Sequence, residues 1–215
     1  MKKVFISGSR NINHLPETVS ERIDNIISAN LEVVVGDSEK GVDALIIKDF
    51  ASRRYPDVTI YTIHNPSRVK DIELKEWDTN LIVPETSKNG KEAETFKDRA
   101  MGDVADYGLV IWQDTYIHPR FKKKSVSSGS LRNMVQLLLR KKPVELYYKN
   151  ENWDEFSHFE LRAIDDLEFY IKEQMDELTF RTFEKILKAE EKQFDTKETL
   201  DDRSNSGEDQ LNLGI

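Results

Sequence analysis

The stretch from residue 105 to residue 148 constrains the fold more than any other part of the chain. Residues 109–112 are a short apolar run, which is typical of a buried strand. Small residues follow at 127–130, directly before an apolar helical pattern that ends at Lys142 and Pro143, and residues 144–147 predict the next strand. A strand, a serine and glycine turn, a helix and a second strand form a βαβ unit, so this stretch predicts a parallel α/β sheet.

The first part of the chain repeats the same arrangement. Residues 4–6 predict a strand, which the turn 7–10 and a helix follow. Residues 31–35 predict the second strand, which leads into the glycine loop 36–43 and another helix, and residues 58–63 predict a third strand. We therefore expect an α/β fold, a Rossmann-like three-layer sandwich with a mainly parallel sheet of about five strands.

Two segments do not follow this alternation. Residues 64–90 contain prolines, an Asn-Gly pair and scattered charges, and they predict a long surface loop with a short helix around residues 72–77. A loop of this length in a compact domain is usually functional or mobile. An amphipathic helix over residues 91–104 follows.

The chain changes character after residue 150. Residues 151–192 form a helix-compatible extension, predicted as one or two amphipathic helices that pack on the domain or form a homo-oligomer. Residues 193–215 are acidic and polar, which is typical of a disordered tail. The expected organisation is thus a nucleotide-binding domain at 1–150, a helical extension and a tail.

Composition narrows the class of protein. The chain of 215 residues has no cysteine, which excludes disulfides, thiolate metal sites and cysteine nucleophiles and fits a reducing, cytoplasmic setting. Nothing resembles a secretory signal, and no apolar run approaches the roughly 20 residues of a membrane span. A net charge of −8 argues against nucleic-acid binding as the main role, although a local basic patch can exist in an acidic chain.

Three small-residue loops each follow a predicted strand, at 7–10, 36–43 and 127–130. In a parallel sheet such loops emerge at the carboxyl edge, where ligands bind, and a serine and glycine turn at a helix N-terminus suits an anion. Neither a P-loop ending nor a Gly-x-Gly-x-x-Gly fingerprint is present. The four histidines lack metal-ligand spacing, so we assign no metal, although Mg²⁺ could accompany a phosphorylated ligand.

The order of these motifs resembles the SLOG superfamily of Rossmann-like nucleotide-binding proteins, which is related to the LOG phosphoribohydrolases and to DNA-processing proteins. The likeness covers roughly residues 3–148 and is strongest to a bacterial group with Gly-Ser-Arg and Gly-x-x-x-Gly-x-Asp motifs. Here four residues rather than three separate Gly36 from Gly41. The resemblance implies a ligand with nucleotide or ADP-ribose-like parts, bound by the glycine loops.

The resemblance also bears on catalysis. The enzymes of the superfamily cleave N-glycosidic bonds with a Glu, and alignment of the glycine turn places Asn133 at that position. Their catalytic Arg falls on Lys97, with Arg99 two residues away. Because Asn cannot serve as a carboxylate base, the sequence lacks the catalytic group on which the hydrolase interpretation depends most.

Three hypotheses follow. The first is a nucleotide-binding sensor or accessory protein, and the second is an N-glycosidic hydrolase or deoxyribosyltransferase that uses Asp37, Asp43 or Asp98. The third is a single-stranded DNA-binding protein that uses Arg10, Lys97, Arg99 and residues 122–124. Asp43 could equally be a helix cap, and the charged residues around Lys97 could equally form the solvent-exposed face of their helix. The predicted ligand-binding residues are Gly8, Ser9, Arg10, Gly36, Asp37, Gly41, Asp43, Lys97, Arg99, Ser128, Gly129, Ser130 and Asn133.

Overall fold

The computed structural model describes residues 1–69, 77–83, 90–153 and 155–207, with side chains described as far as residue 194. The short helix that the sequence predicts around residues 72–77 falls almost entirely on residues 70–76, outside the described residues. The last part of the predicted tail, residues 208–215, also lies outside them.

A seven-stranded sheet forms the centre of the molecule, in the order β4–β3–β2–β1–β5–β8–β9. All neighbouring strands are parallel except β9, which runs antiparallel to β8. A separate antiparallel pair, β6 and β7, follows β5. The strands are β1 Lys3–Gly8, β2 Glu32–Gly36, β3 Val58–Thr62, β4 Asp78–Leu81, β5 Tyr107–Gln113, β6 Thr115–Ile117, β7 Lys124–Val126, β8 Val144–Lys149 and β9 Ser157–Leu161.

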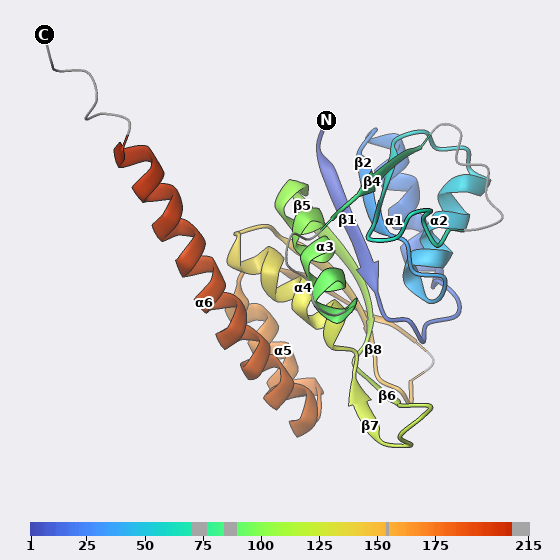
Figure 1. Cartoon of the computed structure of the whole chain (residues 1–215). Coiled ribbons are helices and arrows are strands. Elements are labelled where there is room, and N and C mark those ends of the chain that lie inside the picture. The colour runs from blue at the N-terminus through green and yellow to red at the C-terminus, as the bar shows by residue number, and fades with distance from the viewer. Residues whose placement is uncertain (70–76, 84–89, 154, 208–215) are drawn as a thin grey trace, which may run out of the picture.

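Helices cover both faces of the sheet (Figure 1). The alternation of side chains along a strand separates the two cores: Val4 and Ile6 of β1 face α1 and α2, whereas Phe5 faces α4. The helix α6 packs against α4, with α5 beside it. The helices are α1 Glu17–Ser28, α2 Val42–Ser52, α3 Gly90–Val104, α4 Ser128–Leu139, α5 Ile164–Gln174 and α6 Glu177–Gly207.

The expected α/β, Rossmann-like three-layer sandwich with a mainly parallel sheet is confirmed. The sheet has two strands more than expected, β4 and β9, both at its edges. The sequence predicts helix throughout the range 151–192, but its residues 157–161 form β9, because Phe159 and Leu161 alternate with exposed His158 and Glu160 and pair with β8. No helix within the described ranges is both long and apolar enough to span a membrane.

The C-terminal helix also differs from the pattern in the sequence. α6 continues to Gly207, so helix extends into the range 193–215 that the sequence predicts as a disordered tail. In Figure 1 this part of α6 projects away from the sheet.

The topology creates a crevice at β1 and β5. The chain leaves β1 through α1 toward β2, whereas it leaves β5 through α4 toward β8 on the other side. The two connections therefore diverge at the carboxyl ends of β1 and β5. In open α/β sheets this divergence is the usual place for a ligand.

Candidate functional site

A cavity of about 640 Å³ opens at this divergence point. Its volume falls within the range of about 300 to 1,000 Å³ that is usual for small-molecule sites. The walls come from the ends of β1 and β2, the first turn of α2, the face of α3, the β6–β7 hairpin and the N-terminus of α4.

Most of the residues predicted from the sequence meet at this cavity. Four of the predicted binding residues, Ser9, Asp37, Gly41 and Arg99, are not part of its lining. The predicted binding residues that line it are Gly8, Arg10, Gly36, Asp43, Lys97, Ser128, Gly129, Ser130 and Asn133, and the catalytic candidate Asp98 lines it too.

Two glycines among the predicted residues are required by close packing rather than by a ligand. A Cβ on Gly8 would collide with the backbone oxygen of Ile111 and with Val42 of α2. Gly41 has a φ of +75°, and a Cβ there would collide with the backbone of Arg10. Both glycines bring the β1 loop and the start of α2 into contact, so they shape the cavity indirectly.

The N-terminus of α4 is open toward the cavity. Ser127 is its N-cap residue, but the Ser127 side chain makes no capping hydrogen bond, since its hydroxyl is shared with Ser9. A Cβ on Gly129 would meet no atom within 4 Å. The first backbone N–H groups of a helix carry no intrahelical partner and favour anions.

Two buried side-chain oxygens beside this helix N-terminus lack a partner within the part of the chain that the structure describes. Asn133, on the second turn of α4, and Ser7, at the end of β1, are each only 5% exposed and line the cavity. Neither Asn133 Oδ1 nor Ser7 Oγ has a hydrogen-bond partner among the described residues. Buried polar atoms are rarely left unpaired, and such exceptions call for an explanation.

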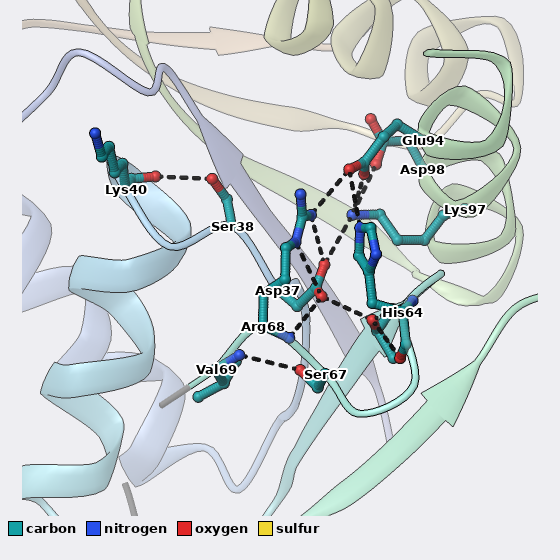
Figure 2. A network of polar contacts seen from close by, with 11 residues as sticks. Asp37, Ser38, Lys40, His64, Ser67, Arg68, Val69, Glu94, Lys97 and Asp98 are labelled. Atoms are coloured by element: carbon teal, nitrogen blue, oxygen red, sulfur yellow. Dashed lines mark hydrogen bonds and ion pairs between the residues drawn. The ribbon is translucent and has the colours of Figure 1, made fainter. Parts of the chain in front are cut away.

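Figure 2 shows a charged network centred on α3, of which Glu94, Lys97 and Asp98 also line the cavity. Asp37 is fully buried and accepts hydrogen bonds from Thr62 Oγ1 at 2.7 Å and from Arg68 Nη2 at 2.8 Å. Burial alone would raise the pKa of Asp37, but the bonds from Arg68 and Thr62 hold that pKa well below its usual range. Asp37 therefore ties the segment around Arg68 to the sheet and is unsuited to accept a proton.

Lys97 of α3 is the centre of this network, and its side chain is only 4% exposed. Its Nζ lies 2.8 Å from Glu94, 3.5 Å from Asp37 and 3.9 Å from Asp98. Burial alone would lower the pKa of Lys97, but the charges of Asp98 and Glu94 raise it. Lys97 is consequently a fixed cation.

The pKa values of Asp43 and Asp98 are raised, whereas the pKa of Asp37 is lowered. Burial is the largest influence on both, and it raises the pKa of Asp43 and raises the pKa of Asp98 to about 7. The Asp43 Oδ2 lies 2.7 Å, and Lys97 Nζ 3.2 Å, from the position that a Cβ on Gly36 would occupy. The glycine thus leaves room for a carboxyl and an ammonium group above β2, and Asp98 is suited to exchange a proton near neutral pH.

Arg99 lies outside the cavity, on the far side of α3. Its Nη2 donates to Glu190 of α6 at 3.0 Å, and Glu190 also accepts from Arg132 Nε and from Gln136 Nε2, each at 3.1 Å. Glu190 is 5% exposed. Arg132 does line the cavity, so it occupies the place that the sequence suggested for Arg99.

The basic segment 120–124 does not face the cavity as a unit. Lys124 forms ion pairs with Asp176 at 2.8 Å and Glu151 at 3.1 Å. Arg120 lies over the ring of Phe121. The basic residues that the third hypothesis assigns to single-stranded DNA binding therefore do not form one exposed patch. Lys97 is buried, and Arg99 is paired with Glu190.

Sequence reasoning missed several residues of the site. Glu94 lies three and four residues before the predicted Lys97 and Asp98, a spacing that places all three on one helix face, so its position could have been found from the sequence. Tyr116 of β6 and His118, which directly follows that strand, also line the cavity. Across the described ranges, no three acidic or histidine side chains are arranged to hold a metal ion.

No protein-family model matches the sequence, and neither does any curated protein. One solved structure that is similar is DNA processing protein A from Helicobacter pylori, which was described for its mode of single-stranded DNA binding. The two chains share 14% identity with a TM-score of 0.45, over 87% of this chain and 81% of that one. At that level of similarity, nothing about the present cavity follows from the likeness.

Proposed function

We propose that the cavity binds a phosphorylated, nucleotide-type ligand and that the protein acts as a sensor or accessory protein. The observation that carries the proposal is the open N-terminus of α4, beside which the unpaired oxygens of Asn133 and Ser7 line the same cavity. A phosphate at this point would accept hydrogen bonds from the backbone N–H groups of Ser128, Gly129 and Ser130.

Basic side chains support the phosphate position. Arg10 and Arg132 both line the cavity, and a guanidinium can donate two parallel hydrogen bonds to a phosphate. Arg132 is held by Glu190 through its Nε, which leaves its terminal nitrogens for a ligand. The unpaired Asn133 and Ser7 oxygens would accept hydrogen bonds from ligand hydroxyl or amino groups.

The charged end of the cavity suits a sugar. The carboxyl groups of Asp43 and Asp98 can accept hydrogen bonds from ribose hydroxyls, and in their protonated forms they can also donate. A ligand that joins phosphate to a hydroxylated ring would therefore engage both the N-terminus of α4 and this charged end. Such a site agrees with the SLOG-like order of the glycine motifs, and we include membership of that superfamily in the proposal.

Hydrolysis or transfer at an N-glycosidic bond is the second candidate, and Asp98 is the reason to consider it. With a pKa of about 7, Asp98 carries a proton in a large part of the molecules at neutral pH. In this reaction Asp98 would protonate the departing base while water, or another acceptor, forms the new bond to the anomeric carbon. Asp43 is the neighbouring carboxyl group available to accept the proton from that water.

A ligand screen with product analysis tests the proposal. The full chain is titrated by calorimetry with nucleoside mono-, di- and triphosphates, ADP-ribose and NAD, and each mixture is then analysed for released base by chromatography. Saturable binding with an intact ligand supports the sensor, and released base supports the enzyme. Binding of none of these compounds would refute the proposal, and salt-sensitive binding of an oligodeoxynucleotide in that case would favour the single-stranded DNA hypothesis.

A further inference from the structure

The β6–β7 hairpin adds an aromatic surface to the rim of the cavity. Tyr116 and His118 line the cavity and are partly exposed, with ring centroids 6.2 Å apart. Ile117, which also lines it, is 58% exposed. This part of the wall differs from the charged end formed by Asp43 and Asp98.

The tip of the hairpin is held in one conformation by its own hydrogen bonds. The backbone N–H of His118 donates to the Lys123 oxygen, and the Lys122 N–H donates to the His118 oxygen, both at 2.8 Å. His118 Nδ1 accepts the backbone N–H groups of Arg120 at 3.2 Å and Phe121 at 3.4 Å. The neutral ring then carries its proton on Nε2, so its orientation is set before any ligand arrives.

The order of the strands places the phosphate position between the two ends of the cavity. The acidic end lies above β2, and β1 and β5 follow in the sheet. The start of α4 is joined to the β1 loop through Ser127 and Ser9, and the hairpin continues from β5 beyond it. In Figure 1 the hairpin projects from the carboxyl side of the sheet.

We propose that Tyr116 and His118 form a stacking subsite for a nucleobase, and that the ligand is therefore a nucleoside diphosphate with its pyrophosphate at the N-terminus of α4. This inference rests on the proposed function, which it deepens. A hydroxylated group attached to the second phosphate lies at Asp43 and Asp98. Aromatic side chains bind the faces of bases, whereas a carboxyl cluster favours hydroxyl groups, so the two ends of the cavity select opposite ends of one ligand.

Calorimetric titration of the full chain with two groups of probes tests the subsite. Inorganic pyrophosphate and ribose 5-phosphate lack a base, whereas ADP and ADP-ribose carry one. The test variant is the double substitution Tyr116→Ala and His118→Ala. The matched control is Phe121→Ala. Phe121 belongs to the same hairpin, is 62% exposed and contacts the His118 ring at 4.7 Å between centroids, but it does not line the cavity, and the variant keeps the backbone N–H that His118 Nδ1 accepts.

We expect the double variant to bind ADP and ADP-ribose about tenfold or more weakly, the usual effect of losing base stacking. Its affinity for pyrophosphate should stay unchanged, which also shows that the variant is folded, and Phe121→Ala should match the wild type for every probe. Unchanged ADP-ribose affinity in the double variant would overturn the subsite but leave the proposed function standing. If the wild type binds none of the four probes, the subsite fails, and the proposed function fails with it when the nucleoside mono- and triphosphates and NAD do not bind either.

Discussion

The hydroxyl oxygens of Ser9 and Ser127 lie 2.9 Å apart, although 118 residues separate them in the chain. Ser9 also bonds to the backbone of Gln113 at the end of β5, accepting its N–H at 3.0 Å and donating to its oxygen at 2.9 Å. The loop after β1 is thereby joined to the N-cap residue of α4. Because the Ser127 hydroxyl is engaged with Ser9, it does not cap α4, and the helix N-terminus stays open to the cavity.

The first prediction concerns Gly129, whose missing side chain leaves the N-terminus of α4 accessible. Gly129→Val should weaken nucleotide binding by about 100-fold or more, because the new side chain occupies the phosphate position. The fold should be retained, since a Cβ there meets no atom within 4 Å. Calorimetry gives the affinity and far-UV circular dichroism gives the fold. Gly102→Val, in the last turn of α3 with equal space around its Cβ, is the control that should bind normally.

The second prediction concerns the pH dependence that Asp98 introduces. Its pKa is about 7 in the folded protein, against about 3.9 in an unfolded chain. Between these values the folded state binds the proton more strongly, so this group lowers the stability as pH rises from about 4 to about 7. Asp98→Asn removes the titration, while Lys97 keeps Glu94 at 2.8 Å.

Urea unfolding at several pH values measures this effect. The stability of Asp98→Asn relative to wild type should increase from pH 4 to pH 7, by about 4 kcal/mol at most because the side chain is 23% exposed, and should level off above pH 8. A difference that stays constant over this range would show that Asp98 ionises normally.

The third prediction separates Asp37 from the catalytic candidates. Asp37→Asn should lower the free energy of unfolding by about 1 to 3 kcal/mol, because Arg68 loses its fully buried counter-charge and keeps Glu94 at 2.9 Å. The pKa of Asp37 is lowered, so the loss should be present above the ordinary aspartate pKa of about 3.9 and should shrink as pH falls below it. Asp43→Asn, measured in the same urea titration, should be no less stable than wild type at pH 7. Equal losses for the two variants would argue against this assignment.

The fourth prediction concerns Glu190, which links α6 to the cavity through Arg132. Glu190→Gln should destabilise the protein by about 1 to 3 kcal/mol, because two arginines lose a buried counter-charge. It should also weaken nucleotide binding, since Arg132 loses the partner that orients it. Thermal unfolding and calorimetry measure the two effects.

A pair on the surface of the same helix is the control for Glu190. Glu177 is 69% exposed and pairs with Arg181 at 2.7 Å. Glu177→Gln should change stability by less than about 0.5 kcal/mol and leave binding unchanged. If the two variants behave alike, Glu190 has no special connection to the cavity.

The parts of the site that follow strands could be predicted from the sequence. Apolar runs with strand periodicity identified β1, β2 and β5, and the carboxyl ends of parallel strands necessarily meet at one edge. Gly8 and Gly36 end β1 and β2, and Gly129 lies in the first turn of α4, which follows β5 after the β6–β7 hairpin, so all three could be assigned to one cavity. The same periodicity failed at β9, whose few apolar residues fit a helix as well as a strand.

Lys97 and Arg99 illustrate the limit of local reasoning. Residues two positions apart on a helix point in nearly opposite directions, so only one of them could face the cavity. Lys97 does so, whereas Arg99 faces Glu190, 91 residues later in the chain. Without the position of α6, the sequence could not decide between them.

The sequence by itself determined the α/β class, the parallel order of the first units and the loops that form the cavity. These features depend on hydrophobic patterns over short stretches of the chain. The tertiary structure alone decided that Asp37 is paired with Arg68, that burial raises the pKa of Asp98 to about 7 and that Arg132 lines the cavity. These properties depend on burial and on charges brought together across long separations in the chain. Such contacts exist only once the helices have docked on the sheet, so no local pattern encodes them.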